Sequence, residues 1–99
     1  MNLKEELSNL KNEVVLLDFY ADWCGPCKML SPILEELSEE FPSLKILKIN
    51  VDEQPEAAQE FNVMSIPSLI FVKDEEVIDV SVGMKSKELL REWIKKNVA

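Results

Sequence analysis

The residues of this chain best suited to chemistry are two cysteines, Cys24 and Cys27, separated by Gly25 and Pro26. They follow an apolar stretch and precede a segment with helical periodicity, so we expect them at the N-terminus of a helix. A helix N-terminus stabilises a thiolate, and a Cys-x-x-Cys pair placed there is suited to making and breaking a disulfide. Because the 99-residue chain has only these two cysteines, any intramolecular redox chemistry must use them.

A metal site is the main alternative for two cysteines at this spacing. Structural zinc takes about four ligands, usually from two such pairs or from cysteine together with histidine. The chain contains no histidine and no further cysteine. We therefore expect redox chemistry and no metal, and the lack of histidine also excludes imidazole acid–base catalysis.

Composition and charge restrict the class of partner. The net charge of −8 argues against binding of nucleic acid and of anionic membrane surfaces, both of which favour basic proteins. The longest aliphatic run, from Val14 to Leu17, is too short to span a bilayer. Charges near the N-terminus occupy positions where a signal peptide needs an apolar core, so we expect a cytoplasmic protein. The length predicts one domain over residues 1–99.

Hydrophobic periodicity predicts the elements that must position the cysteines. We expect helices over residues 3–11, 24–40, 54–61 and 86–97, and strands over residues 14–21, 44–51, 69–73 and 77–82. In the last helix we expect Ser86 to act as the cap and Leu89 to belong to the buried stripe. A helix between the first two strands implies parallel neighbours, and a short turn between the last two implies a hairpin. The fold class is α/β, with a mixed sheet covered by helices on both faces.

Asp18 is a second candidate for a functional residue, because it interrupts the apolar run of the first predicted strand. Burial raises the pKa of a carboxyl group. Position alone leaves two interpretations open. Asp18 either forms a hydrogen bond at a strand end, or it accepts a proton from a nearby thiol.

The segment Asp-Phe-Tyr-Ala-Asp-Trp-Cys-Gly-Pro-Cys-Lys, residues 18–28, resembles the active-site segment of the thioredoxin family almost residue for residue. Ser65-Ile66-Pro67-Ser68 resembles the cis-proline loop of that family, and Val82-Gly83 resembles its glycine after the last strand. The similarity covers about residues 14–98. It implies the thioredoxin fold and a protein-disulfide reductant that works by dithiol–disulfide exchange. It also implies target proteins with disulfides, and recharging by a thioredoxin reductase.

The resemblance implies a role for each site residue. Cys24 would be the nucleophile and the more exposed thiol, and Cys27 the resolving thiol. Asp18 would be the general acid/base for Cys27, and Lys48 would moderate the pKa of Asp18. Pro67 would be cis and place Ile66 beside Cys24. The residues expected to contact the target protein are Trp23, Gly25, Pro26, Ile66, Pro67, Gly83 and Met84. The family resemblance implies no cofactor beyond the Cys24–Cys27 disulfide, and we expect a monomer.

The chain departs from the family pattern in three places. The family usually has a strand before its first helix, whereas the helical pattern here begins almost at Met1. We therefore expect about four strands, with the segment 44–51 at an edge of the sheet. The turn at 74–76 lacks the usual glycine, so it either avoids positive φ or accepts strain. Asn62 is expected in the left-handed conformation.

Two other functions remain open from the sequence. One is a dedicated oxidant or isomerase of the same fold, which the Gly-Pro dipeptide and the match at Asp18 argue against. The other is a non-catalytic binding module that uses the same apolar surface. Turnover of a disulfide substrate distinguishes the binding module from an enzyme.

Overall fold

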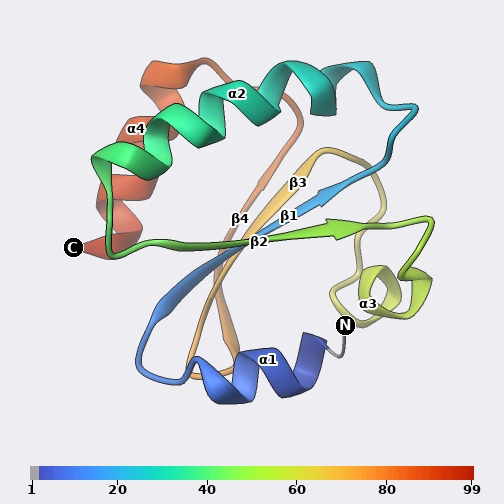
Figure 1. Cartoon of the computed structure of the whole chain (residues 1–99), viewed down its shortest axis with the longest axis horizontal. Helices are drawn as coiled ribbons and strands as arrows, with labels where there is room; N and C mark the ends of the chain where they lie inside the picture. The colour runs from blue at the N-terminus through green and yellow to red at the C-terminus, as the bar shows by residue number, and fades with distance from the viewer. Residues whose placement is uncertain (1–2) are drawn as a thin grey trace.

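The computed structural model describes residues 3–99, and Figure 1 shows four strands with helices on both sides of the sheet. The elements are α1 (Leu3–Asn9), β1 (Val14–Tyr20), α2 (Gly25–Glu40), β2 (Lys45–Asn50), α3 (Pro55–Glu60), β3 (Ser68–Lys73), β4 (Glu76–Val82) and α4 (Lys87–Val98). Each predicted helix and strand is present, and the observed ends differ from the predicted ones by no more than two residues.

The sheet is mixed and has the order β2-β1-β3-β4. β1 pairs with β2 in parallel and with β3 antiparallel, and β3 and β4 form the predicted hairpin. β2 therefore lies at an edge of the sheet, which confirms the expectation for the segment 44–51. The register of β1 and β2 places Asp18 opposite Lys48.

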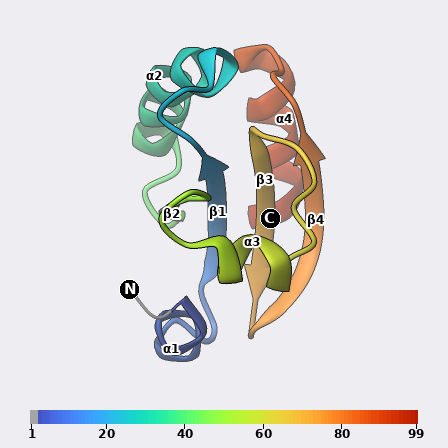
Figure 2. The same cartoon turned by 90° about the vertical axis from the view of Figure 1, so that its right-hand side faces the viewer.

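Two hydrophobic clusters lie on opposite faces of the sheet. One contains Leu3 and Leu7 of α1 and Ala57 of α3, and the other lies beneath α2 and α4 (Figures 1 and 2). Successive side chains of a strand point to opposite faces. Leu17 and Phe19 accordingly pack on the α1 side, and the strand places Asp18 between them on the side of α2.

The helix α4 shows where periodicity was right and where it was wrong. The Ser86 hydroxyl group accepts a hydrogen bond from the backbone N–H of Leu89 at 3.2 Å, which confirms the predicted cap. The prediction that Leu89 is buried was wrong, because its side chain is 62% exposed. The helix turns Leu90 and Ile94, which are four residues apart, toward the sheet. That rotation leaves Leu89 facing the solvent.

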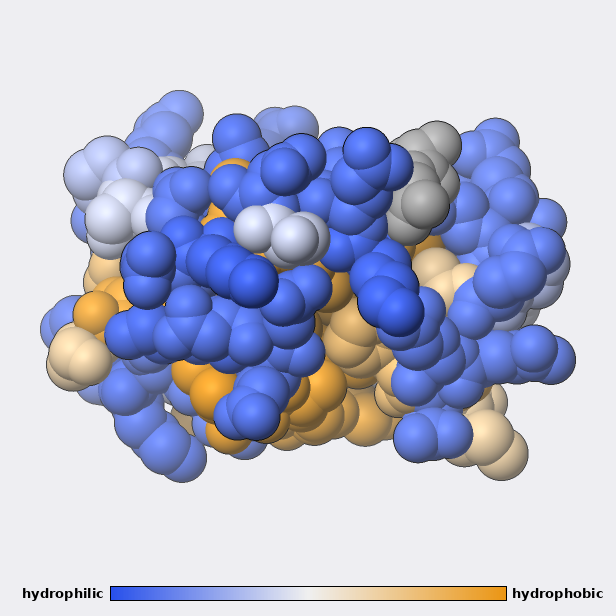
Figure 3. Space-filling model, turned by 90° about the horizontal axis from the view of Figure 1, so that it is seen from below, coloured by the Kyte–Doolittle hydropathy of each residue, from blue (hydrophilic) through white to orange (hydrophobic). Residues whose placement is uncertain are grey.

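The face of the molecule that carries α1 is largely hydrophilic, with some hydrophobic surface in the lower centre of Figure 3. β4 contributes exposed apolar side chains, including Val77 and Val80. Their partners in the register, Val72 and Ile70, belong to the cluster beneath α1 and α3. The sheet therefore extends its apolar face into the outer strand of the hairpin.

Of the two alternatives for the turn between β3 and β4, the structure shows the strained one, with positive φ at residues that are not glycine. Asp74 and Glu75 have φ angles of 51° and 68°, which a two-residue hairpin turn of type I′ requires and which glycine normally supplies. The Asp74 carboxylate accepts a hydrogen bond from the backbone N–H of Asn12 at 2.8 Å. This bond ties the turn to the loop after α1. Asn62 has a φ of 55°, as predicted.

Replacing Glu75 by glycine is expected to stabilise the protein. The left-handed conformation costs a residue with a side chain roughly 1–2 kcal/mol, and the greater freedom of glycine in the unfolded chain offsets part of the gain. We expect the free energy of unfolding of E75G, measured with urea, to rise by roughly 0.5–1 kcal/mol. The adjacent E76G lies within β4 and is expected to lose stability. An E75G variant less stable than the wild type would contradict strain at this turn.

Candidate active site

Cys24 and Cys27 form a disulfide at the N-terminus of α2, with their Cα atoms 5.3 Å apart. Cys24 is the N-cap residue and has extended backbone angles, φ −87° and ψ 107°. Its sulfur accepts a hydrogen bond from the backbone N–H of Cys27 at 3.2 Å. When the disulfide is reduced, the same donor and the helix dipole favour an anion on Cys24.

Both cysteines are buried in this oxidised state. Cys24 is 4% exposed and Cys27 is 7% exposed, so the expectation that Cys24 is the more exposed of the two was wrong for the disulfide. The reason is packing: Cys24 and Cys27 form a small cluster with Ala21, against which Ile66 also packs. Exposed residues on either side of Cys24, including Trp23 and Gly25, keep the disulfide just below the surface.

The Asp18 side chain lies below the disulfide and is 4% exposed. It lines a cavity of about 130 Å³ together with Cys27, Ser31 and Lys48. That volume exceeds what one water molecule needs, and the lining combines apolar surface with the polar groups of Asp18, Ser31 and Lys48. Burial raises the pKa of Asp18 from 3.8 to about 6, and the positive charge of Lys48 acts in the opposite direction. The cavity thus places a carboxyl group of near-neutral pKa beside Cys27.

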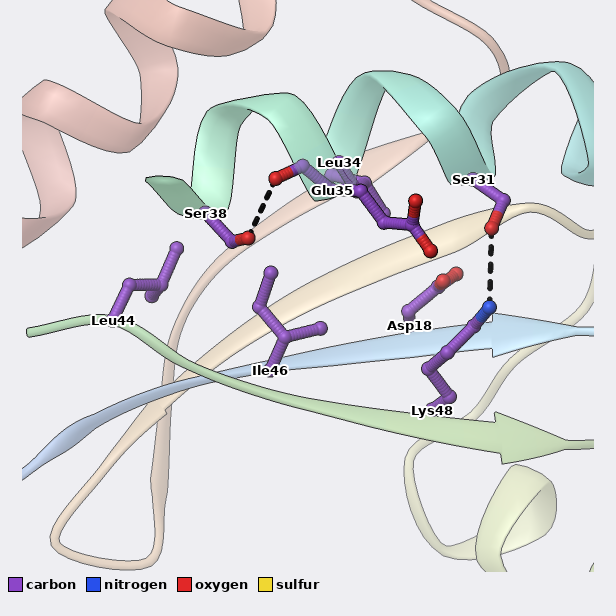
Figure 4. Close-up of a pocket in the computed structure, with 8 residues that line it drawn as sticks. All are labelled: Asp18, Ser31, Leu34, Glu35, Ser38, Leu44, Ile46 and Lys48. Atoms are coloured by element: carbon purple, nitrogen blue, oxygen red, sulfur yellow. Dashed lines mark hydrogen bonds between the residues drawn. The ribbon is translucent and has the colours of Figure 1, made fainter. Parts of the chain in front are cut away.

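Lys48 approaches Asp18 from the edge strand, but it does not form an ion pair with it. Its ammonium group donates a hydrogen bond to the Ser31 hydroxyl oxygen at 3.1 Å and lies 5.3 Å from the centre of the Tyr20 ring. Within residues 3–99, no hydrogen bond or salt bridge engages the Asp18 carboxylate. Figure 4 shows Lys48 bonded to Ser31, with the Asp18 carboxyl group beside them.

The loop before β3 reaches the disulfide through Ile66 and Pro67. The Ile66–Pro67 peptide bond is cis, as the family resemblance implied, and Ile66 packs against the cysteine cluster. The Pro67 carbonyl accepts a hydrogen bond from the backbone N–H of Gly83 at 2.8 Å. Gly83 has a φ of 87°, a conformation that favours glycine. Three of the predicted contact residues are therefore joined beside the disulfide.

The other predicted contact residues differ in their surroundings. Trp23 is 70% exposed, and its indole N–H donates to an Asp52 carboxylate oxygen at 2.8 Å. Gly25 and Pro26 are exposed at the start of α2. Met84 is half-buried and packs against the cluster beneath α2 and α4, whereas Ile66 packs against the cysteines. Met84 thus follows Gly83 in the chain, but its side chain packs against the core.

Three residues that sequence reasoning missed also shape the site. Asp52 anchors the Trp23 indole, and the side-chain oxygen of Asn50 accepts the backbone N–H of Asp52 at 2.9 Å. An asparagine at the end of a strand is a common turn former, so the sequence did indicate this turn. It did not indicate the contact between Asp52 and Trp23. Ser31 had a signal of its own, because it lies four residues after Cys27 on the same helix face.

Comparison with known proteins gives a consistent result. A family model described as Thioredoxin matches residues 1–96. The thioredoxin of Bacillus subtilis is 56% identical over 86 residues, which cover 86% of this chain and 83% of that protein. The thioredoxin of Chlamydia trachomatis is 46% identical over 89 residues, 90% of this chain and 87% of that one. Among solved structures, Fasciola hepatica thioredoxin superposes with a TM-score of 0.88 at 34% identity, covering 95% of this chain and 89% of the other.

Two kinds of feature do not occur in residues 3–99. In this part of the chain no group of three or more histidine, cysteine, aspartate or glutamate side chains is arranged to hold a metal ion. None of the helices found there has the length and apolar character needed to cross a membrane.

Replacing Asp18 by asparagine is expected to stabilise the protein at neutral pH. Because the pKa of Asp18 rises from 3.8 to about 6 on folding, the folded state binds this proton more tightly than the unfolded state. The stabilisation from the protonated carboxyl group is complete below the unfolded pKa and is lost as the pH rises through about 6. A shift of this size corresponds to about 3 kcal/mol. We expect D18N to exceed the wild type by roughly that amount near pH 7, and by little near pH 4.

The measurement is urea unfolding of both oxidised proteins at the two pH values. Comparing the difference between the two proteins removes the contribution of all other carboxyl groups. A stability advantage of D18N that is equal at both pH values would mean that the pKa of Asp18 is not raised in the folded protein.

Proposed function

The chain belongs to the thioredoxin family, and we propose, from the geometry of its site, which residue carries out each step of disulfide exchange. The protein is a protein-disulfide oxidoreductase that acts as a reductant, and its redox centre is the Cys24–Cys27 disulfide. The single observation that carries the assignment of steps is the position of this pair: one sulfur accepts a helix N-terminal N–H, and the other cysteine shares a cavity with Asp18.

In the reduced protein, the Cys24 thiolate attacks one sulfur of a target disulfide. The target S–S bond breaks, a mixed disulfide forms, and the second target sulfur leaves as a thiolate that takes up a proton. Cys27 then loses its proton and attacks the Cys24 sulfur. The mixed disulfide breaks, the Cys24–Cys27 disulfide forms, and the target leaves with two electrons and both thiols reduced. The hydrogen bond between the Cys27 N–H and the Cys24 sulfur supports this division of roles.

Asp18 is the base that accepts the Cys27 proton in the second step. Two observations support this role: the two side chains line one cavity, and the pKa of Asp18 is raised to about 6. A base with a pKa just below the working pH is mostly ionised and still strong enough to accept a proton. Lys48 moderates the basicity of Asp18, because its positive charge favours the carboxylate.

The target is bound by the surface around the disulfide, which we define as Trp23, Gly25, Pro26, Ile66, Pro67 and Gly83. The first three are exposed, Ile66 and Gly83 are half-buried, and Pro67 is buried. The cis-proline loop lies against the cysteine cluster. The backbone of Ile66 there is suited to pairing with an extended segment of the target, as a strand pairs with a sheet edge. Met84, also expected to contact the target, packs against the cluster beneath α2 and α4.

The family to which the chain belongs works with disulfide-containing targets and a thioredoxin reductase, and we propose that such a reductase recharges this protein in the cytoplasm. A dithiol reductant needs a compartment in which thiols are kept reduced, and the cytoplasm is such a compartment.

The roles of the cysteines are tested by trapping the mixed disulfide. We expect the wild type to accelerate the reduction of insulin by dithiothreitol and both serine variants to be inactive. When the reduced proteins are mixed with insulin, C27S should accumulate a covalent adduct through Cys24, detected by mass spectrometry and released by dithiothreitol. C24S should accumulate none. An adduct on C24S but not on C27S would reverse the assignment.

The role of Asp18 is tested by the pH dependence of the second step. The rate at which the preformed mixed disulfide is resolved should rise between about pH 5 and about pH 7 in the wild type, as Asp18 loses its proton. In D18N this rise should be absent, and near pH 7 the rate should be lower by about 10²-fold. E39Q, which removes an exposed carboxylate farther along α2, should keep the wild-type profile. The same rise in D18N would exclude Asp18 as the base.

A further inference from the structure

Ser31 lines the cavities on both sides of Asp18. One is the cavity of about 130 Å³ that also contains Cys27. The other, of about 220 Å³, continues along α2 past Glu35 and Ser38. Cys27, Ser31 and Glu35 follow one another at intervals of four residues, so they lie on one face of α2. In Figure 4 this face lies above Asp18, and the Ser31 and Glu35 side chains extend down toward it.

Lys48 occupies a position from which it would be expected to pair with Asp18. The two residues are directly opposite in the parallel register of β1 and β2, and both line the two cavities. Their opposite charges attract each other, and the charge of Lys48 lowers the pKa of Asp18. The Lys48 ammonium instead donates to the Ser31 hydroxyl oxygen at 3.1 Å and lies over the Tyr20 ring.

We propose that Ser31 is a positioning residue for proton transfer: its hydroxyl group holds the Lys48 ammonium against α2 and thereby keeps it from closing an ion pair with Asp18. This inference rests on the proposed role of Asp18 as the base for Cys27. Ser31 touches neither cysteine sulfur in the hydrogen bonds found in residues 3–99, so it acts through Lys48.

Among the charged groups that face Asp18, Lys48 is the cation that forms a hydrogen bond with Ser31. Lys48 comes from β2 and Glu35 from α2, whereas Asp22 and Lys28 line only the cavity on the Cys27 side. Removing the Ser31 hydroxyl group frees one donor of the ammonium, and the buried carboxylate opposite it is the nearest partner in register. An ion pair would stabilise the ionised form of Asp18 and make it a weaker base.

The test is the titration of the Asp18 carboxyl carbon by carbon-13 NMR in the oxidised protein, where no catalysis is needed. In S31A the midpoint should fall by about one pH unit, the lower end of the shift caused by a paired opposite charge. In S31T, which keeps the hydroxyl group, it should stay at the wild-type value. In K48M the midpoint should rise, and adding S31A to K48M should cause no further change, because the cation that Ser31 holds is gone. Alanine is favourable within a helix, so S31A should fold.

A midpoint in S31A that is unchanged or higher overturns the proposal. The proposal is also overturned if S31A lowers the midpoint by the same amount in the K48M protein as in the wild type, since Ser31 would then act without Lys48. These outcomes are distinct from failure of the proposed function. If D18N keeps the pH dependence of resolution, Asp18 is not the base, but the titration still reports whether Ser31 holds Lys48 away from it.

Discussion

The burial of one carboxyl group beneath the start of α2 is the constraint on which the rest of the site depends. Asp18 lies in a strand whose neighbours Leu17 and Phe19 are fully buried, so its charged form loses most of its hydration. A pKa raised to about 6 corresponds to a cost in stability of about 3 kcal/mol at neutral pH for this arrangement. The same arrangement places a carboxyl group of near-neutral pKa in one cavity with Cys27.

The other sulfur lies in the opposite electrostatic environment. Cys24 occupies the N-cap position of α2, where serine or aspartate is more usual, and its sulfur takes the place of the capping oxygen by accepting the Cys27 N–H. Pro26 lies between them in the first turn and has no N–H that would compete for the sulfur. The helix end thus favours an anion on Cys24, whereas Cys27 shares its cavity with the buried carboxyl group of Asp18.

Local patterns predicted much of this arrangement, and contacts between elements account for what they missed. The apolar run of β1 and the stripe in α2 depend on neighbours in the chain, so the strand, the helix and the buried Asp18 followed from the sequence. The bond between Ser31 and Lys48 joins α2 to β2, and the one between Trp23 and Asp52 joins two loops. Such pairs depend on how the elements pack. The burial of Cys24 depends in the same way on Ile66, far along the chain.

The edge position of β2 decides how strongly Lys48 can act on Asp18. β2 has a neighbouring strand on one side only in the sheet formed by residues 3–99, and Lys48 is exposed to solvent. A charge in contact with water is screened, so its effect on a group several ångströms away is modest unless the two atoms touch. Desolvation therefore outweighs the attraction of Lys48, and the pKa of Asp18 stays raised. The hydrogen bond to Ser31 keeps Lys48 near Asp18 but not bonded to it. The Asp18 carboxyl group can therefore ionise near neutral pH.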